Sequence, residues 1–144
     1  MRRVLVVEDS ISARAFVRAV LEFPEFAAAQ GGCEVVEASC GFDAMRLLPR
    51  SPYDLIITDI NMPDINGLEL VRFIRKSAHH ATTPLLIISS LHKKQDVERG
   101  MALGANGYLP KPFTPEQLRQ ACDRLLGGAV RPATRPSEPP AGGA

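Results

Sequence analysis

The sequence predicts a doubly wound α/β domain, in which one five-stranded parallel sheet carries helices on both faces. Short, continuously apolar runs alternate with segments of helical periodicity along the 144 residues, a pattern typical of parallel sheets that are covered on both sides. The hydrophobic share of 45% and the charged share of 23% are those of a globular chain with a sizeable core. The length fits one domain.

The first half of the chain is expected to supply two strands and two helices. Residues 4–7 are apolar without interruption, as in a strand that is buried on both faces. Residues 12–23 have helical spacing and end at Pro24, which cannot continue a helix. A second strand is expected over 34–38, where flanking glutamates favour an exposed position, and a short helix over 42–48. The apolar face predicted for the first helix comprises Phe16, Ala19, Val20 and Phe23.

The second half repeats the alternation of strand and helix three times. Strands are expected over 54–58, 85–88 and 108–109, and the first two helices over 67–76 and 95–103. The helix over 67–76 is amphipathic: Leu68, Val71 and Ile74 are predicted to face inward, and Glu69, Arg72 and Arg75 outward. With a last helix, the count is five strands and five helices, which indicates a flavodoxin-like (βα)5 domain.

The last helix has clear start and stop signals. Thr114 is a good N-cap, Pro115 suits the first helical position, and Gln117 completes a capping box. Two glycines at 127–128 end the helix. Its apolar stripe comprises Leu118, Ala121, Cys122, Leu125 and Leu126.

Composition limits the partners and the compartment. A formal net charge of +1 gives no electrostatic footprint for nucleic acid, and no apolar run approaches the ~18 residues that insert into a membrane. Three cysteines without Cys-x-x-Cys spacing indicate neither a disulfide framework nor a zinc site, so a cytoplasmic protein is expected. We expect a domain over 1–128 and a flexible Pro-, Ala- and Gly-rich tail or linker over 129–144.

Chemically active side chains follow four of the five predicted strands. Glu8 and Asp9 follow the first strand, Asp59 the third and Ser89 the fourth, while Lys111 follows the fifth. In a doubly wound sheet, ligands bind outside the carboxyl ends of the strands. These five side chains are therefore expected to converge at one rim of the sheet.

Three carboxylates in one cleft require a cation. At a separation of ~4 Å and an effective dielectric of ~20, each like-charged pair costs about 4 kcal/mol. Oxygen ligands in an open site that retains water favour Mg²⁺, with Mn²⁺ as a substitute. An aspartate beside such an ion, with a lysine and a hydroxyl nearby, can act as a nucleophile toward phosphorus.

Four segments resemble the signature blocks of response-regulator receiver domains. These are VVEDS at 6–10, IITDINMPDING at 56–67, IISS at 87–90 and GYLPKPF at 107–113, in the order and spacing of the family. The resemblance covers about residues 3–127. It implies a phospho-accepting switch of two-component signalling, which catalyses its own phosphorylation and dephosphorylation and is not otherwise an enzyme.

The resemblance also implies a metal site and a phosphoryl acceptor. Glu8 and Asp9 would hold Mg²⁺ together with Asp59 and the backbone carbonyl of Asn61. Asp59 would receive the phosphoryl group from a phosphohistidine on a sensor histidine kinase or a histidine phosphotransfer protein.

Further positions would support and report this event. Ser89 and Lys111 would contact phosphoryl oxygens, and Tyr108 would report the state of the site by its inward or outward rotamer. The peptide bond between Lys111 and Pro112 is typically cis in the family, and Gly67 would supply backbone freedom in the loop after the acceptor.

Output is expected through a protein partner, because no effector domain follows in this sequence. A downstream target protein would bind the face formed by the helix over 95–103, the strand over 108–109 and the last helix. A phosphorylation-dependent dimer through this face is also compatible. Both a chemotaxis-type regulator and a phosphorelay intermediate fit this pattern.

Some features depart from the family or are ambiguous. Glu8 stands where aspartate is more usual, and residues 25–32 make the connection to the second strand longer than is customary. Their role is open. His79 and His80 are interpreted as solvated loop residues, since adjacent side chains point apart.

Three alternative interpretations of the chain are compatible with the sequence. A phosphatase of the haloacid-dehalogenase type also uses an aspartate and Mg²⁺, but Asn61 occupies the place of its usual second acid. A receiver-like binding module that does not use phosphate is the second. The third is the amino-terminal receiver of a longer regulator.

Overall fold

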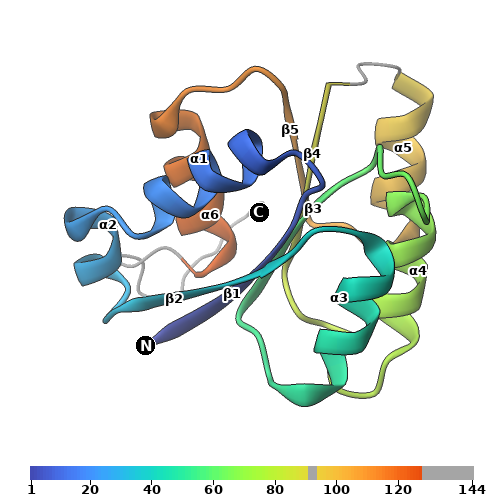
Figure 1. Ribbon diagram of the computed structural model, residues 1–144, viewed down its shortest axis with the longest axis horizontal. Helices are drawn as coiled ribbons and strands as arrows, with labels where there is room; N and C mark the ends of the chain where they lie inside the picture. The colour runs from blue at the N-terminus through green and yellow to red at the C-terminus, as the bar shows by residue number, and fades with distance from the viewer. Residues whose placement is uncertain (91–93, 128–144) are drawn as a thin grey trace.

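The computed structural model describes residues 1–90 and 94–127, which form one sheet between two layers of helices (Figure 1). All strands are parallel, in the order β2-β1-β3-β4-β5. This order confirms the predicted doubly wound, flavodoxin-like class. The predicted tail over 129–144 lies outside the described residues. The strands are β1 Arg2–Val7, β2 Cys33–Ala38, β3 Leu55–Asp59, β4 Leu85–Ser89 and β5 Gly107–Pro110.

The described residues contain six α-helices instead of the predicted five. α1, α2 and α6 cover one face of the sheet, and α3, α4 and α5 cover the other (Figure 1). The additional helix is α2. Pro24 can begin it because the N–H groups of a first helical turn have no partner within the helix, so the N–H that proline lacks is not missed. The helices are α1 Ile11–Leu21, α2 Pro24–Ala29, α3 Gly41–Leu47, α4 Gly67–Lys76, α5 Lys94–Leu103 and α6 Pro115–Leu125, with a 3-10 turn, η1 Leu48–Arg50, after α3.

Two hydrophobic cores lie on opposite faces of the sheet. Alternate residues of β1 enter them: Val4 and Val6 pack with α1 and α6, while Leu5 and Val7 pack with α3 and α4. Every residue of β3 and β4 is buried, as their continuous apolar runs predicted. β2 is an edge strand with half-buried glutamates, which confirms its more exposed position.

α1 buries a different face from the predicted one. The buried residues are Val17, Val20 and Leu21, so only Val20 of the predicted set enters the core. Phe16 is 38% exposed and packs against Phe113, with ring centroids 5.8 Å apart. The predicted face is rotated from the observed one by one residue, because Phe16 serves a contact outside the core.

His80 is not the solvated loop residue that was predicted. Its side chain is fully buried, while His79 is exposed. Nε2 lies 3.0 Å from the carbonyl oxygen of Leu48, which only accepts, so Nε2 carries the proton. Nδ1 lies 3.1 Å from the Thr83 hydroxyl, which can donate or accept, and the ring packs on Tyr53. Both ring nitrogens are satisfied inside the fold, so His80 has a structural role.

Arg75 also differs from its predicted outward position. Its guanidinium donates to the carbonyl oxygens of Gly104, His80 and Thr83 at 2.7–3.0 Å. Burial lowers the pKa of this half-buried group. Arg75 therefore ties α4 to the loop before β4 and to the loop between α5 and β5.

The predicted start of α6 is confirmed. The Thr114 hydroxyl accepts from the Gln117 N–H, and the Gln117 side chain accepts from the Thr114 N–H, which forms the capping box. Gly127 follows the helix with a φ of 99°, a conformation that favours glycine. No helix in the described part of the chain is long and apolar enough to cross a membrane.

The three cysteines are free thiols in this structure. Cys122 is buried in the core beneath α6, and Cys33 and Cys40 are half-buried. Burial raises the pKa of the Cys33 thiol to about 11 and that of Cys122 to about 12. Both thiols are therefore held in the unreactive protonated form.

Candidate functional site

Three carboxylates meet at the carboxyl edge of the sheet, where β1 and β3 end. Glu8, Asp9 and Asp59 each place an oxygen within 4.8 Å of the other two. Glu8 is 1% exposed and Asp59 is 5% exposed, whereas Asp9 lies at the surface. β1 and β3 are hydrogen-bonded neighbours with Val7 opposite Thr58, so their next residues are brought to one place.

Lys111 supplies the cation of this cluster. Its ammonium group lies 2.6 Å from Glu8 Oε1 and 3.3 Å from Asp59 Oδ2. The peptide bond between Lys111 and Pro112 is cis, as the resemblance implied, and the Lys111 N–H donates to the carbonyl oxygen of Ser89 at 2.8 Å. Burial opposes the charge on Lys111, but the hydrogen bond to Glu8 and the charge of Asp59 outweigh it and raise the pKa of the lysine.

The Glu8 carboxylate contacts Lys111 while remaining anchored at its own loop. Its second oxygen accepts from the Ser10 N–H at 3.0 Å. Burial raises the pKa of the Glu8 carboxyl, and the charge of Asp59 acts in the same direction. The hydrogen bonds from Lys111 and Ser10 oppose this shift without cancelling it. The site therefore favours a further cation.

The loop after β3 fixes the position of Asp59. The Asn61 N–H donates to Asp59 Oδ1 at 3.2 Å, and the Gly67 N–H donates to the carbonyl oxygen of Ile60 at 2.8 Å. A Cβ on Gly67 would lie 2.4 Å from the carbonyl oxygen of Asp59 and 2.5 Å from the Cα of Ile60. Gly67 is not among the glycines with positive φ. Glycine is required there by close backbone approach, not by the backbone freedom that was predicted.

Ser89 and Tyr108 come from adjacent strands. Ser89 ends β4 and is fully buried, and Tyr108 on β5 is half-buried in register with Ile87. Burial raises the pKa of the Tyr108 hydroxyl, and a hydrogen bond with the Ser89 side chain opposes that shift. The structure thus brings the predicted serine and tyrosine into contact beside the acidic cluster.

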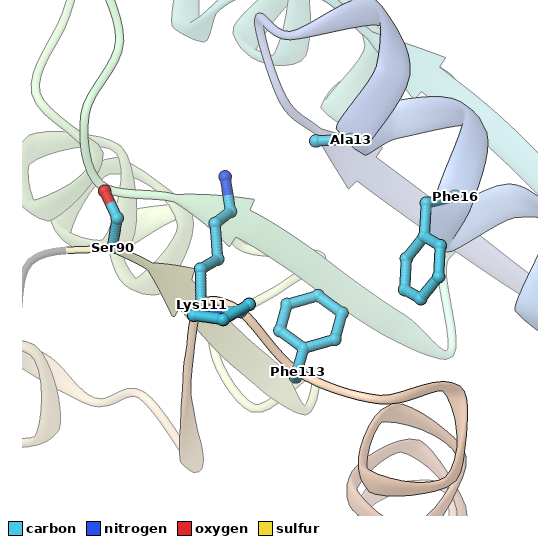
Figure 2. A pocket seen from close by; sticks show the side chains of 6 residues that line it. Ala13, Phe16, Ser90, Lys111 and Phe113 are labelled. Atoms are coloured by element: carbon cyan, nitrogen blue, oxygen red, sulfur yellow. The ribbon is translucent and has the colours of Figure 1, made fainter.

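An apolar groove adjoins the cluster and was not predicted. It encloses about 370 Å³ beside Lys111. Figure 2 shows the Phe16 and Phe113 rings along one side of it and Ser90 on the other. Phe16 could be identified from the sequence only as part of the hydrophobic face of α1, because the loop that carries Phe113 is brought against α1 by tertiary folding. The groove is lined by Ala13, Phe16, Ser90, Lys111, Pro112 and Phe113.

Asp64 is a second feature that sequence reasoning missed. It lies in the loop between β3 and α4, and its carboxylate accepts from the N–H groups of Gly41, Phe42 and Ile65 at 2.8–3.1 Å. Cys40, at the N-cap of α3, makes no capping bond with its side chain, so Asp64 caps that helix from another segment. Burial opposes ionisation, but the hydrogen bonds lower the pKa of Asp64 from 3.8 to about 2.

Replacing Asp64 with alanine should lower the free energy of unfolding by about 1 kcal/mol at neutral pH, as for the loss of a helix cap. Because the pKa of Asp64 is lower in the folded state, its contribution is complete above about pH 4 and is lost as the pH falls through about 2. Urea unfolding at several pH values would measure this. A difference from wild type that is as large at about pH 2 as at neutral pH would contradict the assignment.

The donor set fits a hard divalent cation. It consists of carboxylate oxygens only, two of the three acids are buried, and among the described residues one ammonium group, that of Lys111, pairs with Glu8 and Asp59. Negative charge is therefore in excess at the rim. Oxygen ligands with one acid open to solvent suit Mg²⁺, which keeps several waters when it binds.

A buried aspartate beside two further carboxylates and a lysine is an arrangement compatible with phosphoryl transfer to the aspartate. The family model of the response regulator receiver domain matches residues 4–123. This chain therefore belongs to the response-regulator receiver domains, the phospho-accepting switches of two-component signalling. Membership sets aside the dehalogenase-type phosphatase.

Similar proteins support this assignment. The chain is 33% identical over 126 residues to a chemotaxis protein CheY homolog of Campylobacter jejuni, covering 87% of this chain and 92% of the relative. It superimposes on the chemotaxis response regulator CheY4 of Vibrio cholerae with a TM-score of 0.77 and 35% identity, covering 87% and 98% of the two chains. The receiver domain of the sensor histidine kinase PA1611 from Pseudomonas aeruginosa, solved with a magnesium ion coordinated in its active site cleft, gives a TM-score of 0.76 at 26% identity, covering 88% and 98%.

Proposed function

We propose that this chain is a magnesium-dependent switch in which Asp59 accepts a phosphoryl group from a phosphohistidine. The donor would be a sensor histidine kinase or a histidine phosphotransfer protein. Glu8, Asp9, Asp59 and the backbone carbonyl of Asn61 would hold Mg²⁺, with Mn²⁺ as a substitute. When bound, the metal would neutralise charge on the transferring group. The observation that carries the proposal is the approach of Lys111 to both Asp59 and Glu8.

The transfer forms one bond and breaks another. An Asp59 carboxylate oxygen attacks phosphorus, the phosphorus–nitrogen bond of the donor breaks, and the imidazole leaves with its electron pair. Lys111 lies 3.3 Å from Asp59 Oδ2, close enough to pair with an oxygen of the arriving group. The Ser89 hydroxyl would hydrogen-bond another phosphoryl oxygen. Later attack by water on the phosphoryl group releases inorganic phosphate and restores the Asp59 carboxylate. The protein would therefore catalyse only its own phosphorylation and dephosphorylation.

The donor must reach Asp59 from outside the sheet. The groove between Phe16 and Phe113 opens beside Lys111, and Ile11 at the start of α1 is 76% exposed. These apolar side chains flank the acidic cluster, so a donor protein that packs on them would bring its histidine to the acceptor. This supports a protein donor over a small phosphorylated metabolite.

The output would be a change in the face formed by α5, β5 and α6. Phosphorylation adds about two negative charges. Engagement of Ser89 by the phosphoryl group would alter its hydrogen bond with Tyr108, and the tyrosine would change rotamer on that face. A downstream target protein, or a second phosphorylated copy, would bind there. We further propose a cytoplasmic domain over residues 1–128 with a tail or linker over 129–144.

Phosphorylation by phosphoramidate tests the proposal, with intact mass as the readout. Wild type should gain one phosphoryl group in Mg²⁺, and the gain should disappear with a chelator. Asp59→Asn should gain none. Asp54→Asn is the matched control: Asp54 lies at the opposite end of β3, where the amide oxygen can still accept from the Arg3 N–H. A folded wild type that binds Mg²⁺ without gaining mass would contradict the proposal and favour a phosphate-independent binding module.

A further inference from the structure

Arg14 connects the acidic loop to two other elements of the fold. It lies on α1, and its side chain is 17% exposed. Nη1 donates to the backbone carbonyl oxygen of Glu8 at 2.7 Å, and Nε donates to Glu37 Oε1 on β2 at 2.8 Å. One guanidinium therefore binds the end of β1 and the edge strand at the same time, with two donors in fixed relative geometry.

Glu37 is itself held in place. Its other carboxylate oxygen accepts from Arg18, one turn further along α1, and Arg18 also pairs with Glu22. Hydrogen bonds from Arg18 and Arg14 lower the pKa of the half-buried Glu37 carboxyl. Arg14 is thus oriented by a charged partner, and its Nη1 donates to the Glu8 peptide group. Arg18 shares that partner, and its hydrogen bonds within the described residues go to Glu37 and Glu22 instead of the acidic loop.

The Glu8 carbonyl belongs to the peptide group that joins Glu8 to Asp9. The orientation of this group sets where both side chains point. Glu8 is otherwise anchored through its own N–H, its carboxylate and Lys111. The Asp9 carboxylate makes no hydrogen bond or ion pair with the described residues, so its direction depends on the backbone. A bond to the Glu8 carbonyl is therefore the contact best placed to orient Asp9.

We propose that Arg14 is a positioning residue for the divalent cation, which holds the Glu8–Asp9 peptide group so that both carboxylates face the same point. The inference rests on the proposed function, because it assumes that these carboxylates bind Mg²⁺. It adds a residue that is not a ligand. Hydrogen bonds that orient ligand groups typically change metal affinity about 10- to 100-fold when removed.

Electrostatics and positioning predict opposite results for Arg14. Removing a positive charge near an acidic cluster strengthens cation binding through the electrostatic field alone. Loss of the orientation of the Glu8 and Asp9 carboxylates weakens cation binding. Arg14→Met removes both donors and keeps the length of the side chain, and Arg14→Lys keeps the charge but cannot bind both partners in the same way. Arg18→Met is the matched control, since it removes one charge from the same helix and the same partner, Glu37.

Calorimetric titration with Mg²⁺, together with the rate of phosphorylation by phosphoramidate, tests the proposal. Arg14→Met and Arg14→Lys should bind Mg²⁺ about tenfold more weakly. At saturating Mg²⁺, their phosphorylation rates should lie close to that of wild type. Arg18→Met should bind Mg²⁺ at least as tightly as wild type. Arg14→Lys provides the same measurement if Arg14→Met does not fold.

Unchanged or tighter Mg²⁺ binding by both Arg14 variants would overturn the proposal. So would equal weakening by Arg18→Met, since the effect would then belong to the ion-pair network as a whole. Wild-type protein that binds no Mg²⁺ would overturn the proposed function and this inference with it. Wild-type binding with unaffected variants would overturn this inference alone, so the two failures are distinguishable.

Discussion

Lys111→Met is expected to slow phosphorylation of Asp59 about a hundredfold at saturating Mg²⁺. The ammonium group lies 3.3 Å from Asp59 Oδ2, and it is the cation that contacts the buried acids directly. Charge on the phosphoryl oxygens grows during transfer, and removal of a preorganised donor of this kind typically costs 10²–10³-fold in rate. The initial rate of mass gain with phosphoramidate measures the effect, and Lys76→Met on the surface of α4 is the control.

The same substitution should destabilise the protein when Mg²⁺ is absent. Without Lys111, the Glu8 carboxylate keeps its hydrogen bond from the Ser10 N–H and stays next to Asp59. Removing one partner of a buried ion pair lowers the free energy of unfolding by about 3–5 kcal/mol. The loss stays in the lower part of that range if Glu8 takes up a proton, because no unpaired charge is then buried. Urea unfolding in chelator should show the loss, and Mg²⁺ should recover part of it. Phosphorylation rates of Lys111→Met within threefold of wild type would show that Lys111 does not assist the transfer.

The site was predictable because strand order alone brings its residues together. Each strand end could be found from an apolar run, and parallel strands place those ends at one edge, so Glu8, Asp59 and Lys111 needed no knowledge of side-chain contacts. What the sequence did not reveal was which bonds join these loops to distant segments. Arg14 on α1 reaches the Glu37 side chain on β2, and Asp64 caps α3 from the loop after β3. Such bonds leave no local pattern, since any Arg or Asp of that spacing also fits an exposed surface.

The parts of the fold that were wrongly predicted have a similar cause. Pro24 ends one helix and also begins another, and the local sequence does not distinguish these uses. His80 and Arg75 are polar residues near a loop, where exposure is the usual outcome. His80 is buried and Arg75 half-buried because Thr83 and several backbone carbonyls surround them in the folded chain. Burial of a polar side chain depends on its partners, which are set by tertiary structure.

Gly67→Ala is expected to lower the free energy of unfolding by about 2–3 kcal/mol and to reduce phosphorylation of Asp59 about a hundredfold. The new methyl would lie 2.4 Å from the Asp59 carbonyl oxygen and 2.5 Å from the Ile60 Cα. Both are backbone atoms at the end of a fully buried strand, so neither can rotate away. The favourable helix propensity of alanine, about 1 kcal/mol, is too small to offset the clash.

Gly100→Ala is the matched control because it makes the same change at another buried helical glycine. There the methyl would meet Ile87 Cδ1 at 2.5 Å, the free end of a side chain that can adopt another rotamer. The free energy of unfolding of Gly100→Ala should stay within about 1 kcal/mol of wild type, and its phosphorylation rate should be unchanged. Urea unfolding and intact mass would be measured on both variants. Equal stability and equal phosphorylation rates for Gly67→Ala and Gly100→Ala would show that the loop after β3 can move away from the added methyl. Close packing against Gly67 would then not be what fixes the position of Asp59.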